Sequence, residues 1–248
     1  MLPAQPNRGL IDGLQCLRAL AISKTPVGVR EMANRMLMEP TKVHRLLKTL
    51  TYMGMVQQDK ERRYLIGGGI QVLANLGFNG SELEWRRDKA IQLLSRDIKH
   101  NIAFGVMWEG MVTYLEGIQQ SSKIVAGDGI DQISWDSLEE ASTCCTGLVL
   151  LAGKNDEEVE RIYRGRPIPG FIGGLGDLRR KLSEIQVRNY AYLTEVTRQR
   201  LGALAVPFTD GLSALEVRGP IVQGDFQRIS EIVRQVILTV ERSWRWNE

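Results

Sequence analysis

The chain is 248 residues long, which exceeds one typical domain and makes two domains the natural expectation. Hydrophobic residues make up 43% of the sequence, yet no apolar run approaches the ~18 residues that a helix needs to span a membrane. The N-terminal residues also lack the apolar stretch of a secretory signal, which predicts a cytoplasmic protein with no membrane partner.

The net charge of +3 conceals an uneven distribution along the chain. Residues 1–79 hold 11 of the 32 Lys and Arg residues but only 5 of the 29 Asp and Glu residues, a net charge of +6. Residues 80–248 carry the remaining charges, with a net charge of −3. A basic segment of this kind is typical of a domain that binds nucleic acid.

The chain has only three cysteines and two histidines, the residue types that most often form disulfides and bind transition metals. The three cysteines, Cys16, Cys144 and Cys145, fit a reducing compartment better than a disulfide framework. The two histidines have no cysteine or carboxylate at ligand spacing, so no metal and no cofactor are predicted. We expect His100 to end a helix, where the helix dipole favours a positive side chain.

Helical periodicity predicts two helices before residue 40. The first runs from about residue 9 to residue 22, with Cys16 partly buried beside its apolar stripe. That stripe is expected to consist of Leu10, Leu14, Leu17 and Ala21. The second helix covers residues 29–36 and carries Val29, Met32, Ala33 and Met36 on one face.

A third helix opens at Pro40, whose fixed φ suits the first helical position, and Gly54 is expected to cap its end. Its buried stripe consists of Val43, Leu46, Leu47 and Leu50. Two short strands around the turn at residues 59–62 complete a winged helix-turn-helix. The predicted DNA contacts are the exposed residues of the helix and wing: Thr41, Lys42, His44, Arg45, Lys48, Lys60, Arg62 and Arg63.

The runs PTKVHRLLKTLTYMGMV (residues 40–56) and RYLIGGGIQVLA (residues 63–74) resemble the N-terminal domain of IclR-type bacterial transcriptional regulators. The matching residues, among them His44, Arg45 and Gly54, keep the family's order and spacing. The resemblance implies a regulator that places the helix from Pro40 in the major groove of a double-stranded operator.

After the wing, the run Gly67–Gly69 is expected to form a hinge, because consecutive glycines cost backbone entropy inside a regular element. Residues 70–78 are almost wholly apolar, which predicts a linker helix within residues 68–80. Such a helix either packs on its own chain or pairs with a partner protomer. The resemblance favours pairing and implies a homodimer or tetramer.

The remaining residues predict an α+β domain with a mainly antiparallel sheet. Strands are expected at residues 102–108, 111–118, 190–196, 203–208 and 213–218, with a further one at 123–126. Helices are expected at residues 81–100, 141–152, 156–163, 177–189 and 226–244. The resemblance extends here to a GAF-like effector domain. The expected division is a winged helix-turn-helix over residues 1–67, a linker over 68–80 and an effector domain over 81–248.

The resemblance also implies effector contacts at Cys144, Cys145, Thr146, Ala203, Glu216 and Arg218. Strand alternation agrees for the last two, because Leu215 and Val217 would face the packed helices and leave Glu216 and Arg218 towards an effector cavity. A sugar acid or small carboxylate would satisfy both charges. The alternative is an ion pair across an exposed surface.

The function that these observations favour is a ligand-responsive DNA-binding regulator without enzymatic activity. The rival is an enzyme or a thiol-based redox sensor that uses Cys144 or Cys145 near a helix start. No histidine accompanies the two cysteines in their motif. In the rival hypothesis the winged helix serves protein contacts.

Overall fold

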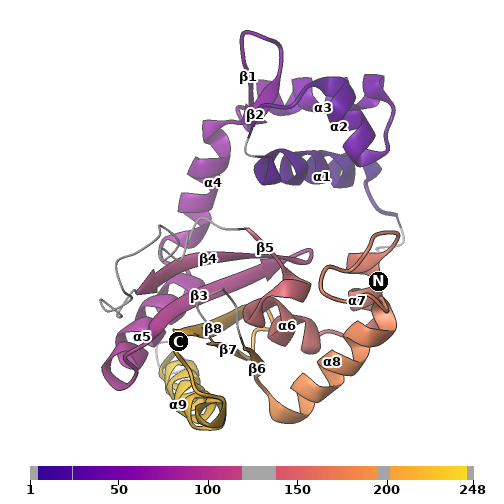
Figure 1. The fold of residues 1–248 in the computed structure, drawn as a ribbon. Coiled ribbons are helices and arrows are strands. Elements are labelled where there is room, and N and C mark those ends of the chain that lie inside the picture. Colours follow the sequence, from indigo (N-terminus) through magenta and orange to yellow (C-terminus); the bar gives the residue numbers. More distant parts are fainter. Residues whose placement is uncertain (1–4, 24, 119–137, 195–201, 245–248) are drawn as a thin grey trace, which may run out of the picture. The chain divides into compact units, whose positions relative to one another are not determined.

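The computed structural model describes residues 5–23, 25–118, 138–194 and 202–244. The chain divides into two compact units, Met1–Ser81 and Glu82–Glu248 (Figure 1). The strand expected at residues 123–126 and the end of that at 190–196 lie outside the described residues. Within the described part, no helix has both the length and the apolar character to cross a membrane. The finer division at residues 67 and 80 stays a prediction.

The first unit is a winged helix-turn-helix. Three helices, α1 (Arg8–Ile22), α2 (Val29–Met36) and α3 (Pro40–Tyr52), pack on one apolar core. The wing consists of β1 (Val56–Gln58) and β2 (Tyr64–Ile66), which pair antiparallel. Val27 and Tyr64 exchange two backbone hydrogen bonds of 2.8 Å, which tie the chain before α2 to the wing.

The third helix is as the sequence predicts. It begins at Pro40, and Val43 and Leu47 are fully buried in the core while Leu46 and Leu50 are partly buried. Gly54 has a φ of 74°, which confirms the left-handed residue expected after the helix.

The prediction for the buried face of α1 is wrong. The residues that turn inward are Asp12, Cys16 and Leu20, whereas Leu10 and Leu14 are 61% and 47% exposed. Apolar residues surround this helix on more than one side, so periodicity alone does not select the core face. Burial of Asp12 is compensated by an ion pair with Lys42 of α3. Cys16 lies at the centre of the core rather than at its border.

The glycine run Gly67–Gly69 lies at the start of a helix, and its action as a hinge stays a prediction. Gly67 caps α4 (Gly68–Phe78), and the other two glycines form its first turn. The N–H groups of Gly67 and Gly69 donate to the carbonyls of Met55 and Gly54 at 2.9 and 3.0 Å. A Cβ at Gly67 would lie 2.5 Å from the Gly54 oxygen, so glycine permits a close backbone approach here.

The linker helix α4 buries none of its residues within the described part of the chain. Its apolar side chains are left in solvent, with Val72, Leu73 and Leu76 exposed by 58%, 55% and 72%. Within the described residues of the first unit, this helix therefore does not pack on its own chain, and pairing with a partner protomer stays a prediction.

The second unit is built on a six-stranded antiparallel sheet. Its strands are β3 (Asn101–Trp108), β4 (Met111–Ile118), β5 (Glu139–Glu140), β6 (Ala191–Leu193), β7 (Gly202–Pro207) and β8 (Ser213–Gly219). They lie in the order β5-β4-β3-β8-β7-β6, and every neighbouring pair is antiparallel. A winged helix-turn-helix followed by an α+β unit is the predicted fold class.

Helices cover both faces of this sheet. Figure 1 shows α5 (Glu82–Asp97) and α9 (Phe226–Trp244) on one side of the sheet, where Leu215 and Val217 belong to their core. The other side carries α6 (Cys145–Ala152), α7 (Asp156–Tyr163) and α8 (Leu175–Arg188). Here the sheet presents small side chains to α6, at Ala103, Ala203, Ala205 and Ala214. The two apolar clusters confirm the predicted alternation along β8.

Three predicted boundaries in this unit need correction. The helix expected at residues 141–152 is a 3-10 turn over Ala141–Thr143 followed by α6, because Cys144 is extended. α8 begins at Leu175 rather than at residue 177. α5 ends at Asp97, so His100 lies beyond its last turn. Burial and then the charge of Arg228 lower the pKa of His100, which opposes the expected cationic role.

Candidate DNA-binding and effector sites

The exposed side of α3 carries the predicted DNA contacts. Because Val43 and Leu47 are buried in the core, the opposite side of the helix faces outward. The predicted residues of the helix are all exposed: Thr41, Lys42, His44, Arg45 and Lys48. The structure therefore brings them to one helix surface, and their contact with DNA stays a prediction.

Lys42 differs from the other predicted contacts on α3, because its ammonium group is paired with a carboxylate among the described residues. It forms an ion pair with Asp12 of α1, whose carboxylate is largely shielded from solvent. This contact joins α1 to α3 and competes with any phosphate for the same lysine. Helical periodicity does not predict this contact, because it assigns the inward side of α1 to apolar residues and not to Asp12.

The wing presents Lys60, Arg62 and Arg63 in exposed positions at or beside its turn. Arg63 donates to Asp59 at 3.0 Å and to Glu61 at 3.2 Å, so it also stabilises the turn. The Lys48 ammonium lies 3.3 Å from the amide oxygen of Gln58 and links α3 to the wing. This contact holds the basic residues of α3 next to those of the wing.

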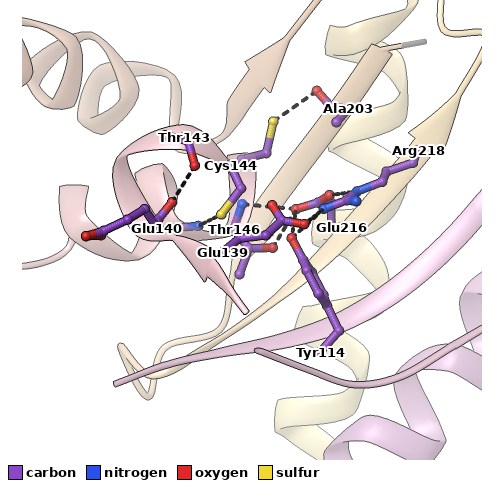
Figure 2. Close-up of polar contacts among 11 residues, drawn as sticks. Tyr114, Glu139, Glu140, Thr143, Cys144, Thr146, Ala203, Glu216 and Arg218 are labelled. Atoms are coloured by element: carbon purple, nitrogen blue, oxygen red, sulfur yellow. Dashed lines mark hydrogen bonds and ion pairs between the residues drawn. The ribbon is translucent and has the colours of Figure 1, made fainter. Parts of the chain in front are cut away.

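The six predicted effector residues gather in the second unit (Figure 2). Cys144, Cys145 and Thr146 form the start of α6, and this helix packs against the strands that carry Ala203, Glu216 and Arg218. The Cys145 thiol donates to the Ala203 carbonyl at 3.2 Å. Strand alternation and α6 packing bring the set together, and contact with a ligand stays a prediction.

The carboxylate of Glu216 is the centre of this cluster and is completely buried. Its Oε2 accepts hydrogen bonds from the Thr146 backbone N–H at 3.1 Å, the Thr146 hydroxyl at 2.7 Å and the Tyr114 hydroxyl at 3.1 Å. Its Oε1 accepts from Nε of Arg218. Several donors and an ion pair compensate the desolvation of this charge.

Arg218 connects Glu216 to two further groups. Its Nη2 donates to the Tyr114 hydroxyl at 2.5 Å and to Oε1 of Glu139 at 3.2 Å. Burial disfavours the charged guanidinium, but Glu216, Tyr114 and Glu139 together outweigh burial and raise the pKa of Arg218. The side chain of Arg218 is 15% exposed and that of Glu216 is 0% exposed, which rules out the alternative of an open surface ion pair.

The two adjacent cysteines are poorly suited to thiolate chemistry. Burial, followed by the charge of Glu216, raises the pKa of the Cys144 and Cys145 thiols. The Cys144 sulfur accepts from the N–H of Gly147 at 3.3 Å as the cap of α6. In α1, burial raises the pKa of Cys16 to about 11. A raised pKa keeps these groups protonated near neutral pH and lowers their nucleophilicity.

Tyr114 and Glu139 belong to the cluster but were not predicted from the sequence. Tyr114 lies on β4 and reaches Glu216, 102 positions further along the chain. Burial and then the Glu216 carboxylate raise the pKa of Tyr114, so it remains a hydrogen-bond donor. Alternation along β4 places Val112 and Tyr114 on one face, and this was the only sequence signal for Tyr114.

A separate hollow of about 680 Å³ lies beside α7 and the loop before α8, lined in part by Tyr163, Arg166, Phe171 and Ile172. None of the predicted effector residues lines it. Across the described ranges, no group of three or more His, Cys, Asp or Glu side chains is arranged to hold a metal ion.

Comparison with known proteins agrees with this arrangement. The sequence model of the IclR helix-turn-helix domain matches residues 12–60. The HTH-type transcriptional regulator KdgR of Escherichia coli is 24% identical over 216 residues, which cover 84% of this chain and 80% of that protein. Residues 12–60 thus form a helix-turn-helix domain of the IclR type, and the chain as a whole is similar to IclR-type transcriptional regulators.

The chain also resembles solved structures over nearly its whole length. An IclR family transcriptional regulator from Brucella abortus matches with a TM-score of 0.75 and 19% identity, over 96% of this chain and 93% of that one. An IclR homologue from Microbacterium hydrocarbonoxydans, complexed with 4-hydroxybenzoate, matches with a TM-score of 0.60 and 18% identity, over 96% and 99%. The second unit accordingly has the GAF-like fold that the resemblance predicted.

Proposed function

We propose that the protein binds a double-stranded operator through α3 and the wing and that a small molecule bound by the second unit controls this binding. The observation that carries the proposal is the exposed row Thr41, His44, Arg45 and Lys48 on α3, within the segment that matches the IclR helix-turn-helix domain. A helix in the major groove reads base edges, while basic residues of a wing hold phosphates.

Dimerisation through α4 is part of the proposal. The exposed Val72, Leu73 and Leu76 form an apolar strip that a second copy of α4 would cover. A two-fold dimer presents two recognition helices, and such proteins bind DNA sites with matching two-fold symmetry. We therefore propose a palindromic operator. A tetramer would pair two such dimers.

Effector binding is supported by the gathering of the predicted contacts around Glu216 and Arg218 and by the Microbacterium structure, which holds a small aromatic acid. Catalysis is not part of the proposed function. The relatives are regulators, and burial protonates the two cysteines on which the enzyme or thiol-sensor hypothesis depends.

Selection from a random pool of DNA duplexes tests the proposal without knowledge of the operator. The purified protein should enrich one motif with two-fold symmetry, and binding to the enriched duplex should weaken steeply with added salt because phosphate contacts release counterions. The matched control is a duplex with the same base composition in scrambled order. Enrichment of no motif, or equal affinity for the scrambled duplex, would refute specific operator binding.

A further inference from the structure

The N-terminus of α6 forms an anion position inside the second unit. α6 is eight residues long, and its early N–H groups and dipole favour a negative charge at this end. The N–H of Thr146 lies 3.1 Å from a carboxylate oxygen there, and the Thr146 hydroxyl lies 2.7 Å from the same oxygen. Tyr114 and Arg218 add donors from the sheet. The anion that these groups hold is the side chain of Glu216.

The Glu216 carboxylate is bound as completely as a ligand would be. One oxygen accepts three hydrogen bonds, from Thr146 twice and from Tyr114, and the other accepts from Arg218. Two carboxylate oxygens together offer about four acceptor sites. The four hydrogen bonds therefore match the number of acceptor sites of the carboxylate. Because Glu216 is completely buried, its carboxylate is not in contact with bulk water.

The charges around Arg218 are also unfavourable to a second anion. Arg218 contacts the carboxylates of both Glu216 and Glu139, so one positive charge faces two negative charges. An acidic ligand would bring a third negative charge to this cluster. To reach the helix N-terminus it would have to displace Glu216, which would leave a buried carboxylate without its partners.

We propose that Glu216 occupies, from within the chain, the anion position at the N-terminus of α6 and thereby excludes small carboxylic acids from the effector site. The proposal rests on the effector-binding role proposed above for the second unit. It replaces the sugar acid or small carboxylate that the sequence favoured with a ligand that is not an acid. Glu216 is in this sense a residue that determines effector specificity.

Thermal unfolding of the wild-type protein gives the first test. Sodium acetate, gluconate and 4-hydroxybenzoate are titrated at constant ionic strength against sodium chloride. No saturable rise in Tm is expected with any of the three acids, because the position that would bind their carboxylate is filled. A saturable rise with any of them overturns the proposal.

The variant Glu216→Ala gives the second test, because it removes a group of the size and charge of acetate. The variant should have a lower Tm than the wild type, and acetate should restore it saturably, whereas the neutral acetamide should not. Equal effects of acetate and acetamide, or none, would show that the site is not an anion position. If Glu216→Ala does not fold, the wild-type titration still decides.

DNA binding is measured on the same wild-type preparation, which separates the two proposals. Failure to select any DNA motif would refute the proposed regulatory function and leave the acid titrations unchanged. A saturable response to an acid, with DNA binding intact, would refute only the exclusion of acids by Glu216.

Discussion

Arg45 forms no ion pair among the described residues, whereas Lys42 and Arg63 are both paired. It lies on the exposed side of α3. Arg45→Ala should lower affinity for the selected duplex roughly 5- to 150-fold, as the loss of ~1–3 kcal/mol for a base contact implies.

The measurement is fluorescence anisotropy with the selected duplex, together with a thermal unfolding curve. Arg180→Ala is the matched control, because it removes the same charge from an exposed position on α8 of the other unit. Unchanged affinity of Arg45→Ala, or a collapse of its Tm, would contradict the placement of the DNA-binding face.

The ion pair between Asp12 and Lys42 gives a second prediction at this scale. Asp12→Asn removes the carboxylate that competes with phosphate for Lys42 and keeps the shape of the side chain. DNA affinity should rise several-fold at low salt, and the rise should shrink as salt screens the new phosphate contact. The double variant with Lys42→Ala should show no such gain. A gain that persists in the double variant would rule out Lys42 as its source.

Glu216 shows how far single-residue prediction from sequence can reach. Alternation along β8 correctly separates Glu216 and Arg218 from Leu215 and Val217, because alternation is a local property of a strand. The partners Tyr114 and Thr146 come from positions 102 and 70 residues away, and no local pattern links them to Glu216. Their identity depends on how α6 packs on the sheet.

At the scale of elements, α4 stands out because it has no buried residue in the described part of the chain and exposes several large apolar side chains. Leu73→Glu places a charge in the exposed strip of α4 and should shift the protein towards monomers in sedimentation velocity. Loss of two-site binding should lower operator affinity roughly 100-fold. Gln71→Glu is the control, because Gln71 is an exposed polar residue of the same helix. A Leu73→Glu protein that remains fully dimeric would place the interface elsewhere.

The contact between α6 and the preceding turn depends on Gly147. A Cβ at Gly147 would lie 2.2 Å from both Cα and O of Ala141. Gly147→Ala should therefore reduce the free energy of unfolding by about 1–3 kcal/mol, a typical cost of overpacking. Gly176→Ala, in α8, meets no atom within 4 Å and should be neutral or slightly stabilising. Chemical denaturation of both variants measures the difference, and equal stabilities would contradict the tight contact.

Elements with a single apolar stripe were the most predictable. α9 begins and ends at the expected residues, and its buried side chains follow one stripe. α1 also has the expected length, but its core face depends on Asp12 reaching Lys42 in another helix. The close backbone contact at Gly67–Gly69 escapes sequence prediction for a similar reason, because the Gly54 backbone that approaches this run comes from another part of the sequence.

At the scale of the whole molecule, the salt dependence of DNA binding shows how many protomers contact the DNA through their wings. Each phosphate contact contributes about −0.9 to the slope of log affinity against log salt concentration. Lys60 is exposed at the wing, so Lys60→Ala should reduce the slope by about 1.8 if both wings of a dimer contact DNA. A reduction of about 0.9 would indicate one engaged wing. An unchanged slope would exclude a phosphate contact by Lys60.

The exposed apolar strip of α4 has a consequence for gene dosage. If operator binding requires two chains joined through Val72, Leu73 and Leu76, the concentration of the binding species rises with the square of the protomer concentration when most chains are unpaired. Halving expression would then reduce operator occupancy about fourfold in that range. A cell could therefore switch the target promoter through the rate of synthesis of this protein alone, before any effector is present.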